Sequence, residues 1–359
     1  MTFLLDLDGT PHAGCSARAL PPRNWRAHIV SFRLRKCASR HRIEHDATHE
    51  PPHKLPTMTF TALMLGVVSG LAFASIFVLI ALSLTMVLAA SGVFNFAQGT
   101  IVMGGTILAY LFAVKLGWTP LVVVSVILGV GVLAGLLTHF LSVWPAIGRA
   151  KSFAHTTVLT TIGLGTAANA VIVLLFGGES FPVPSFVSDD PVRLGSVPIR
   201  PIYIVMVLSG AALTLAIDRL IRGTALGHMF RATLEDPEGA LLYGIDTRKV
   251  ITLSFGAAGA LSAIAGFLVA PVIHASAFTA HDLAFYGFAG MAIGGFGSFA
   301  GALVGGVVVG LIYGVVPVVL DSHLTVPVMW LAVVAVLLVR PSGLLGTAGL
   351  FGSARLREV

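Results

Sequence analysis

The sequence predicts an all-α polytopic membrane protein with about eight or nine transmembrane helices. Three observations predict this class: 56% of the 359 residues are hydrophobic, only 11% are charged, and long stretches carry no charge at all. An ordinary soluble domain has about 25% charged residues, and one helical bilayer crossing needs about 20 apolar residues. The charges are too few for a soluble surface, so the chain belongs in a membrane.

The cysteines and the net charge exclude two other classes of function. Cys15 and Cys37 both precede the first apolar stretch, so the membrane part has no cysteine-based metal or redox site. The net charge of +6 is concentrated in residues 1–57, which hold nine Lys and Arg against five Asp and Glu. Because the rest of the chain is nearly neutral, we expect no nucleic-acid partner, and we expect no catalytic residue, metal or cofactor.

Residues 1–57 are polar, rich in Arg, His and Pro, and lack sustained periodicity, which is typical of disorder. Phe3–Thr10 has the letters of a haloacid-dehalogenase phosphatase motif, but that chemistry needs a whole α/β domain. HEPPH at 49–53 resembles a zinc-protease motif only in letters, because Pro51 and Pro52 forbid the required helix. We expect a disordered or non-native extension, with Met58 opening the uncharged run.

The expected membrane helices follow the uncharged stretches in order. The run from Leu55 to Val114 leaves room for two crossings, and Pro120 begins the next helix at a position where a missing N–H does little harm. Residues 177–200 contain four prolines and read as a loop outside the membrane. The expected helices cover about 63–90, 99–115, 120–144, 157–176, 201–220, 248–270, two shorter helices within 283–320, and 324–339.

Two stretches of the membrane part each allow two interpretations. Asn95 and Gln98 lie between the first two helices, either in a simple interfacial loop or in a broken segment that lines a path through the protein. Ten glycines lie between Leu283 and Leu320, several of them four residues apart. Such spacing favours close helix packing, and a hinge for gating is the alternative. Pro271 is expected to end the sixth helix.

The sides of the membrane follow from Lys and Arg in short loops. Arg149 with Lys151, the stretch 222–249, and Arg340 with the basic residues after it should share the cytoplasmic side. In a nine-helix count these segments are separated by even numbers of crossings, and the first helix starts outside. If the first uncharged run held one crossing and a re-entrant segment, the total would be eight.

The stretch 222–249 is the one long charged interruption in the membrane part. Leu226 to Leu234 has the spacing of a short amphipathic helix. A second helix should begin after Asp236, which can act as N-cap with Glu238 in the first turn, and Gly244 should end it. This loop is either a docking surface or interfacial packing.

The chain carries no energy-coupling site of its own. No charged residue lies deep in an expected span, whereas an ion-coupled carrier normally needs such a relay. No Walker A sequence is present, so the chain does not hydrolyse ATP. We therefore expect an energised partner.

Several motifs together carry a family resemblance across residues 63–346. They are GVFNFAQG at 92–99, RATLED at 231–236, LLYGIDT at 241–247, GGFGS at 294–298 with Gly301, and RPSGLLG at 340–346. As a set they make the chain similar to the membrane permeases of the branched-chain amino acid ABC importers, the high-affinity leucine/isoleucine/valine system, and specifically to its H-type subunit.

The resemblance implies a non-enzymatic transport subunit in the bacterial inner membrane. It implies a second permease subunit, two cytoplasmic ABC ATPase subunits and a periplasmic or lipid-anchored substrate-binding protein as partners. The permease domain would cover 58–346, with a cytoplasmic coupling loop at 222–249 and a cytoplasmic tail at 347–359. The expected substrate is a branched-chain or other hydrophobic amino acid. Urea or short amides, an ion-coupled secondary transporter, and a non-transporting scaffold are the alternatives.

The resemblance also implies roles for particular residues. Glu238, Ala240 and Gly244 match the EAA-x-x-x-G coupling pattern, with Gly239 in place of its middle alanine. Gln98 stands where the family usually has histidine. The residues implied for coupling to the ATPase are Arg231, Glu235, Asp236, Glu238 and Gly244; those for the translocation path are Asn95, Gln98 and Gly99; those for helix packing or gating are Gly294, Gly295, Gly297, Gly301 and Gly305.

Overall fold

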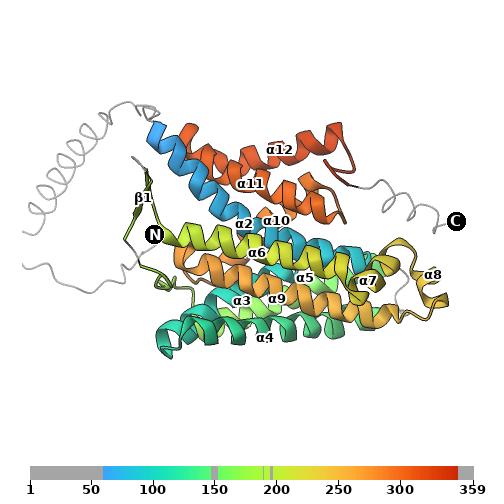
Figure 1. Ribbon diagram of the computed structural model, residues 1–359. Coiled ribbons are helices and arrows are strands. Elements are labelled where there is room, and N and C mark those ends of the chain that lie inside the picture. Colours follow the sequence, from blue (N-terminus) through green and yellow to red (C-terminus); the bar gives the residue numbers. More distant parts are fainter. Residues whose placement is uncertain (1–59, 147–152, 189, 195–196, 347–359) are drawn as a thin grey trace, which may run out of the picture. The chain divides into compact units, whose positions relative to one another are not determined.

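The computed structural model describes residues 60–146, 153–188, 190–194 and 197–346 (Figure 1). The expectations for residues 1–57, for Arg149 and Lys151, and for the tail 347–359 lie outside the described residues. The described chain is built almost wholly of helices, which confirms the all-α class.

Within the described residues eleven α-helices follow one another, two of them short and lying between the fifth and sixth expected spans. They are α2 (Phe60–Ser91), α3 (Gln98–Ala109), α4 (Pro120–Thr138), α5 (Phe153–Phe176), α6 (Pro201–Gly223), α7 (Ala225–Glu235), α8 (Pro237–Leu242), α9 (Thr247–Ile273), α10 (Thr279–Gly294), α11 (Phe299–Val319) and α12 (Thr325–Val339). Single π-helical turns extend α3 over Tyr110–Lys115 and α4 over His139–Val143.

Eight of the described helical segments are long and apolar enough to cross a membrane. The expected number of eight or nine is thus confirmed. Both helices of the first uncharged run qualify, whereas α10, with 16 residues, does not. At 1.5 Å per residue, α10 is only about 24 Å long, so the ambiguity in the helix number lies in α10 and not in the first run.

Two local expectations need correction. Helix α9 continues past Pro271 to Ile273, because proline has a helix-compatible φ and removes only one N–H donor in a turn that ends anyway. The stretch 177–200 also contains a small antiparallel hairpin of β1 (Val192–Leu194) and β2 (Val197–Ile199), with Val192 paired to Ile199.

Helix α2 is the centre of the bundle. In its membrane-length window 89% of the residues are buried, against 78% for α9 and 11% for α5. Helices α11, α9, α10 and α6 pack around α2, and α3 and α4 pack on α9. A helix that is apolar on all sides, as α2 is, suits this central position.

The polar elements separate to the two ends of the bundle. At one end, called here the loop end, Phe230 of α7 packs against Ala90 of α2, Val250 of α9 and Phe299 of α11. At the opposite end, Phe181 bridges Ala275 after α9. Figure 1 shows α7 and α8 at one end of the helices and β1 at the other.

Close backbone contacts at glycines set the helix packing. An added Cβ at Gly305 on α11 would overlap the carbonyl oxygen of Gly290 on α10, and one at Gly314 would overlap that of Gly66 on α2. Equivalent overlaps join α9 to α3 at Gly266 and to α4 at Gly259. Helices in lipid associate largely through such packing, so these glycines determine how closely the backbones approach.

We expect Gly305→Ala to destabilise the protein, because the new methyl group meets backbone that cannot move aside, at a cost of about 1–3 kcal/mol. Gly104→Ala on α3 is the matched control, since nothing lies within 4 Å of a Cβ there. The control should keep or gain stability, because alanine favours a helix by about 1 kcal/mol over glycine. Thermal unfolding in detergent would test this, and equal melting temperatures for the two variants would contradict the packing argument.

Candidate functional site

A buried hydrogen-bond network joins Asn95 and Gln98 to two neighbouring helices. The Asn95 amide Nδ2 donates to Gln98 Oε1 at 2.9 Å, and Gln98 Nε2 donates to the Ala258 carbonyl at 2.8 Å and to Ser262 Oγ at 2.7 Å. Ser262 Oγ in turn donates to Ser83 Oγ at 2.9 Å. The network ties α2, α3 and α9 together and leaves Asn95 and Gln98 3% and 1% exposed.

This network lies at mid-depth in the membrane part. Gln98 meets α9 at Ala258 and Ser262, and α9 runs from Thr247 to Ile273. At 1.5 Å per residue, Ala258 is about 17 Å from the start of α9. The chain therefore leaves α2 at Ser91, at the loop end, and returns as non-helical backbone to mid-depth before α3 begins at Gln98. This geometry favours the broken segment over the simple interfacial loop.

A cavity of about 300 Å³ lies beside the broken segment. Asn95, Gln98 and Gly99 line it, so the three residues that the resemblance implied for the path lie together at one cavity. The rest of its wall is mainly aromatic or aliphatic, including Phe94, Phe96, Ile80, Leu84, Phe285 and Phe288. Pockets for small ligands typically have about this volume and a mostly apolar wall with few polar groups.

The aromatic side chains of the cavity also contact one another. The ring centroids of Phe94 and Phe288 are 5.9 Å apart, and those of Phe96 and Phe288 are 6.3 Å apart. Phe296, from the α10–α11 junction, is 5.6 Å from Phe94. These are favourable edge and stacking separations. The amide groups of Asn95 and Gln98 are largely engaged with each other and with α9, so the cavity presents mainly an apolar surface.

Helices α7 and α8 form a second candidate site at the loop end. Phe230 and Thr233 are buried and anchor α7 to the bundle, while Thr224 caps its first turn by accepting a hydrogen bond from the Gly227 N–H at 3.1 Å. The residues implied for coupling all lie exposed here: Arg231, Glu235, Asp236, Glu238 and Gly244. Among the described residues, no three His, Cys, Asp or Glu side chains gather where a metal ion would bind.

The turns on both sides of α8 are defined by specific backbone contacts. Asp236 Oδ1 accepts a hydrogen bond from the Glu238 N–H at 3.1 Å, which caps α8 as expected. An added Cβ at Gly239 would lie 2.5 Å from Asp236 Oδ2, which gives a physical reason for glycine in place of the pattern's alanine. Gly244 has φ +80°, and the Ile245 N–H bonds back to the Ala240 carbonyl at 3.0 Å. A glycine in this left-handed conformation is a common helix stop.

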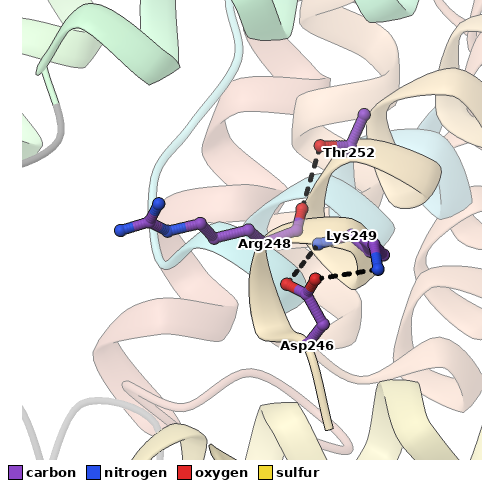
Figure 2. Close-up of polar contacts among 4 residues, drawn as sticks. All are labelled: Asp246, Arg248, Lys249 and Thr252. Atoms are coloured by element: carbon purple, nitrogen blue, oxygen red, sulfur yellow. Dashed lines mark hydrogen bonds and ion pairs between the residues drawn. The ribbon is translucent and has the colours of Figure 1, made fainter.

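Asp246 fixes the end of the loop to α9 (Figure 2). Its Oδ1 accepts a hydrogen bond from the Lys249 N–H at 3.3 Å, and its Oδ2 lies 3.2 Å from Lys249 Nζ. These contacts, the side-chain hydrogen bond first, lower the pKa of Asp246 below its usual value. The expected cap of α9 is therefore confirmed, and the carboxylate stays charged at neutral pH.

The loop also exposes apolar side chains that the sequence reasoning did not single out for the site. Leu242 and Tyr243 at the end of α8 are 89% and 90% exposed, while the neighbouring Ala240 is 4% exposed. Adjacent large apolar residues on a rigid, solvent-facing turn are typical of a protein contact. The sequence signal that could have identified these residues is an apolar Leu-Leu-Tyr run directly before a glycine stop, in the most charged stretch of the membrane part.

The glycines at the α10–α11 junction meet the segment after α12. Gly295 and Gly297 have φ values of +118° and +76°, which favour glycine. The Leu344 and Leu345 N–H groups donate to the carbonyls of Ile293 and Gly294 at 2.9 and 2.8 Å. Two of the motifs behind the family resemblance, 294–298 and 340–346, thus form one structural unit at the loop end. Gly301 and Gly305 extend the α10–α11 contact from there.

Comparison with known proteins identifies several similar transport proteins. The family model described as branched-chain amino acid transport system, permease component, matches residues 66–340. The high-affinity branched-chain amino acid transport system permease protein LivH of Escherichia coli (strain K12) is 27% identical over 293 residues, covering 77% of this chain and 94% of the relative. The probable LivH of Methanocaldococcus jannaschii is 27% identical, covering 67% and 76%. The fructose import permease protein FruF of Bifidobacterium longum is 25% identical, covering 66% of each chain.

We expect Gln98→Leu to destabilise the protein, because it removes three side-chain hydrogen bonds from a buried network. Hydrogen bonds between membrane helices are worth about 0.6 kcal/mol each, up to about 1.7, so the loss should be about 2–4 kcal/mol. Thr100→Val at the same cavity, whose hydroxyl donates only to the Gly165 carbonyl at 3.2 Å, should have a smaller effect. Thermal unfolding would measure both. Unchanged stability in Gln98→Leu would mean that the network does not hold the broken segment.

Proposed function

Because this chain belongs to the family of permease components of branched-chain amino acid transport systems, we propose that it forms, with a second permease subunit, the membrane path for branched-chain or other hydrophobic amino acids. The chain is a transport subunit of an ABC importer and not an enzyme. The observation that carries the substrate proposal is the mid-depth cavity beside Asn95 and Gln98, whose wall is mainly aromatic and aliphatic.

The cavity favours a hydrophobic substrate over a strongly polar one. A passing leucine or isoleucine side chain would contact Phe94, Phe96 and Phe288, and transfer of such a side chain out of water is favourable by about 1.5–3 kcal/mol. Urea, a short amide or a sugar would need more hydrogen-bonding groups than this wall offers. The similarity to a fructose import permease makes a direct comparison of substrates the appropriate test.

The energy for transport would come from ATPase subunits that dock at the loop end, which we assign to the cytoplasm. The charged residues of the eight described spans lie near helix ends, as Lys115, Asp218 and Arg222 do. This arrangement supplies no mid-depth ion relay and supports ATP-driven transport over the ion-coupled alternative. Arg231, Glu235, Asp236 and Glu238 would contact the ATPase together with the apolar tip of α8.

The positions proposed for the other transporter components follow from assigning the loop end to the cytoplasm. We place the chain in a bacterial inner membrane with two ATPases on its cytoplasmic side. A periplasmic or lipid-anchored binding protein would deliver substrate at the opposite end, where the β1–β2 hairpin lies. Substrate selection would then be shared between the binding protein and the cavity.

Reconstitution of the chain with its cognate permease, ATPases and binding protein in vesicles tests the function. We expect ATP-driven uptake of leucine to exceed uptake of urea and of ribose by at least about tenfold, a difference of about 1.4 kcal/mol. Uptake that follows a proton or sodium gradient without ATP would contradict the proposal, as would the absence of uptake of every substrate tested.

The apolar tip of α8 provides a sharper test of coupling. Leu242→Asp should leave the chain folded, because Leu242 is 89% exposed, but it should weaken the complex with the ATPase. Loss of an apolar interface anchor costs about 2 kcal/mol or more, so ATP-driven uptake should fall at least tenfold. Leu324→Asp at the opposite end, where Leu324 is 43% exposed, is the control and should retain ATPase binding. Normal ATPase binding and uptake in Leu242→Asp would remove the tip from the docking surface.

A further inference from the structure

A groove between α6 and α11 is charged at one end and apolar at the other. It encloses a cavity of about 410 Å³. Leu82 of α2 is buried at its floor, while Leu215 of α6 and Leu303 of α11 are 55% and 41% exposed at its sides. Helix α7 contributes Arg231 and Glu235 at the loop end. The groove shares no lining residue with the mid-depth cavity, so it is a separate site.

The groove runs from the loop end into the apolar depth of the bundle. Arg222 lies in the last turn of α6, and Thr214 lies two turns deeper. At 1.5 Å per residue, Thr214 is about 14 Å from the end of α6 at Gly223, and Leu82 is about 14 Å from the end of α2 at Ser91. An occupant of the groove must therefore be polar at the loop end and apolar beyond it, which is the composition of a phospholipid.

The charges at the loop end of the groove balance one another. Asp218 Oδ1 lies 2.6 Å from Arg222 Nε, so these two side chains already neutralise each other. Neither Arg231 nor Glu235 has an ion-pair partner among the described residues. Because they are four residues apart on α7, they share one face, with their Cβ atoms about 5–6 Å apart. One unpaired cation and one unpaired anion thus remain side by side for a ligand.

A zwitterionic headgroup with a primary ammonium suits this pair of charges. Its phosphate would accept N–H bonds from Arg231, because the planar guanidinium binds phosphate with two parallel hydrogen bonds. Its ammonium, joined to the phosphate through two carbons, would donate to Glu235, whose ionised carboxylate only accepts. Basic pockets at the cytoplasmic side bind anionic headgroups, but here such a headgroup would place its phosphate beside Glu235 without compensation. A quaternary ammonium would have no N–H to donate.

We propose that this groove binds one phospholipid of the phosphatidylethanolamine class, with its headgroup between Arg231 and Glu235 and an acyl chain along Leu82. The inference goes beyond the proposed function and does not depend on which substrate is carried. The lipid would fill the space between α6 and α11, which both pack on α2. Arg231 and Glu235 also border the surface proposed for the ATPase, so the headgroup would lie between the bundle and the docked ATPase.

A phosphatidylethanolamine that carries a photoreactive diazirine on one acyl chain tests the site. The full complex with the cognate permease, ATPases and binding protein is used in lipid vesicles, and crosslinked peptides are identified by mass spectrometry. We expect label on the α6 and α11 peptides that contain Leu215 and Leu303. Unlabelled phosphatidylethanolamine should compete for these positions at least about tenfold better than phosphatidylglycerol or phosphatidylcholine, a factor that corresponds to about 1.4 kcal/mol.

Two outcomes with the unaltered chain would overturn the proposal. One is the absence of label from both peptides, which would result if the partner permease covered the groove. The other is equal competition by the three lipids, which would mean that the groove holds bulk lipid without recognising a headgroup. Labelling does not require substrate uptake, so a failure of the proposed transport function would be recognised separately by the uptake assay.

Substitutions of the two unpaired charges provide an independent measurement. Arg231→Gln should lower labelling at the groove at least about tenfold, because it removes charge-assisted hydrogen bonds to the phosphate. Arg248→Gln is the matched control, since Arg248 is also exposed at the loop end but does not line the groove. Glu235→Gln should let phosphatidylglycerol compete as well as phosphatidylethanolamine, because the ammonium loses its charged partner.

Unchanged labelling in Arg231→Gln, or an unchanged lipid preference in Glu235→Gln, would overturn the proposal. Both side chains are exposed, so we expect both variants to fold, and thermal unfolding of each purified complex checks this. If a variant does not assemble, the competition among the three lipids in the unaltered complex decides the result by itself.

Discussion

The fold depends on backbone-to-backbone contact at glycines. Apolar side chains gain little by leaving lipid for one another, so helix association relies on packing and on interhelical hydrogen bonds. Glycines at positions 66, 259, 266, 290, 305 and 314 remove the side chains that would hold α2, α3, α4, α9, α10 and α11 apart. The central position of α2 follows, because its neighbours reach it closely enough to bury most of its surface.

That close packing positions the network around Gln98. Gln98 reaches both Ala258 and Ser262 only because α3 and α9 lie against each other at Gly105 and Gly266. The network then holds non-helical backbone at mid-depth and leaves a mainly apolar cavity beside it. Polar side chains inside a membrane are commonly read as substrate contacts, but here the amides mainly support the wall. The phenyl rings of Phe94, Phe96 and Phe288 supply the surface that a hydrophobic substrate would meet.

Packing between helices also connects the cavity to the loop end. Phe230 anchors α7 against α2, α9 and α11, and the segment 340–346 caps α10. A force applied at the exposed tip of α8 would therefore act on helices that also line the cavity. Such a path from docking surface to cavity through packed helices is what an ATP-driven change of access requires.

The sequence by itself determined the class, the order of the helices and the caps of the charged loop. Charge-free stretches, the Asp236 cap and the Gly244 stop depend on neighbouring residues, so they can be read locally. The motifs at 92–99, 231–236, 241–247, 294–298 and 340–346 also identified the family. The sequence did not determine that Gln98 would bond to Ala258 and Ser262, or that motifs at 294–298 and 340–346 would meet. It also did not separate the buried Ala240 from the exposed Leu242. These distinctions depend on contacts between helices far apart in the chain, and only the tertiary structure decides them.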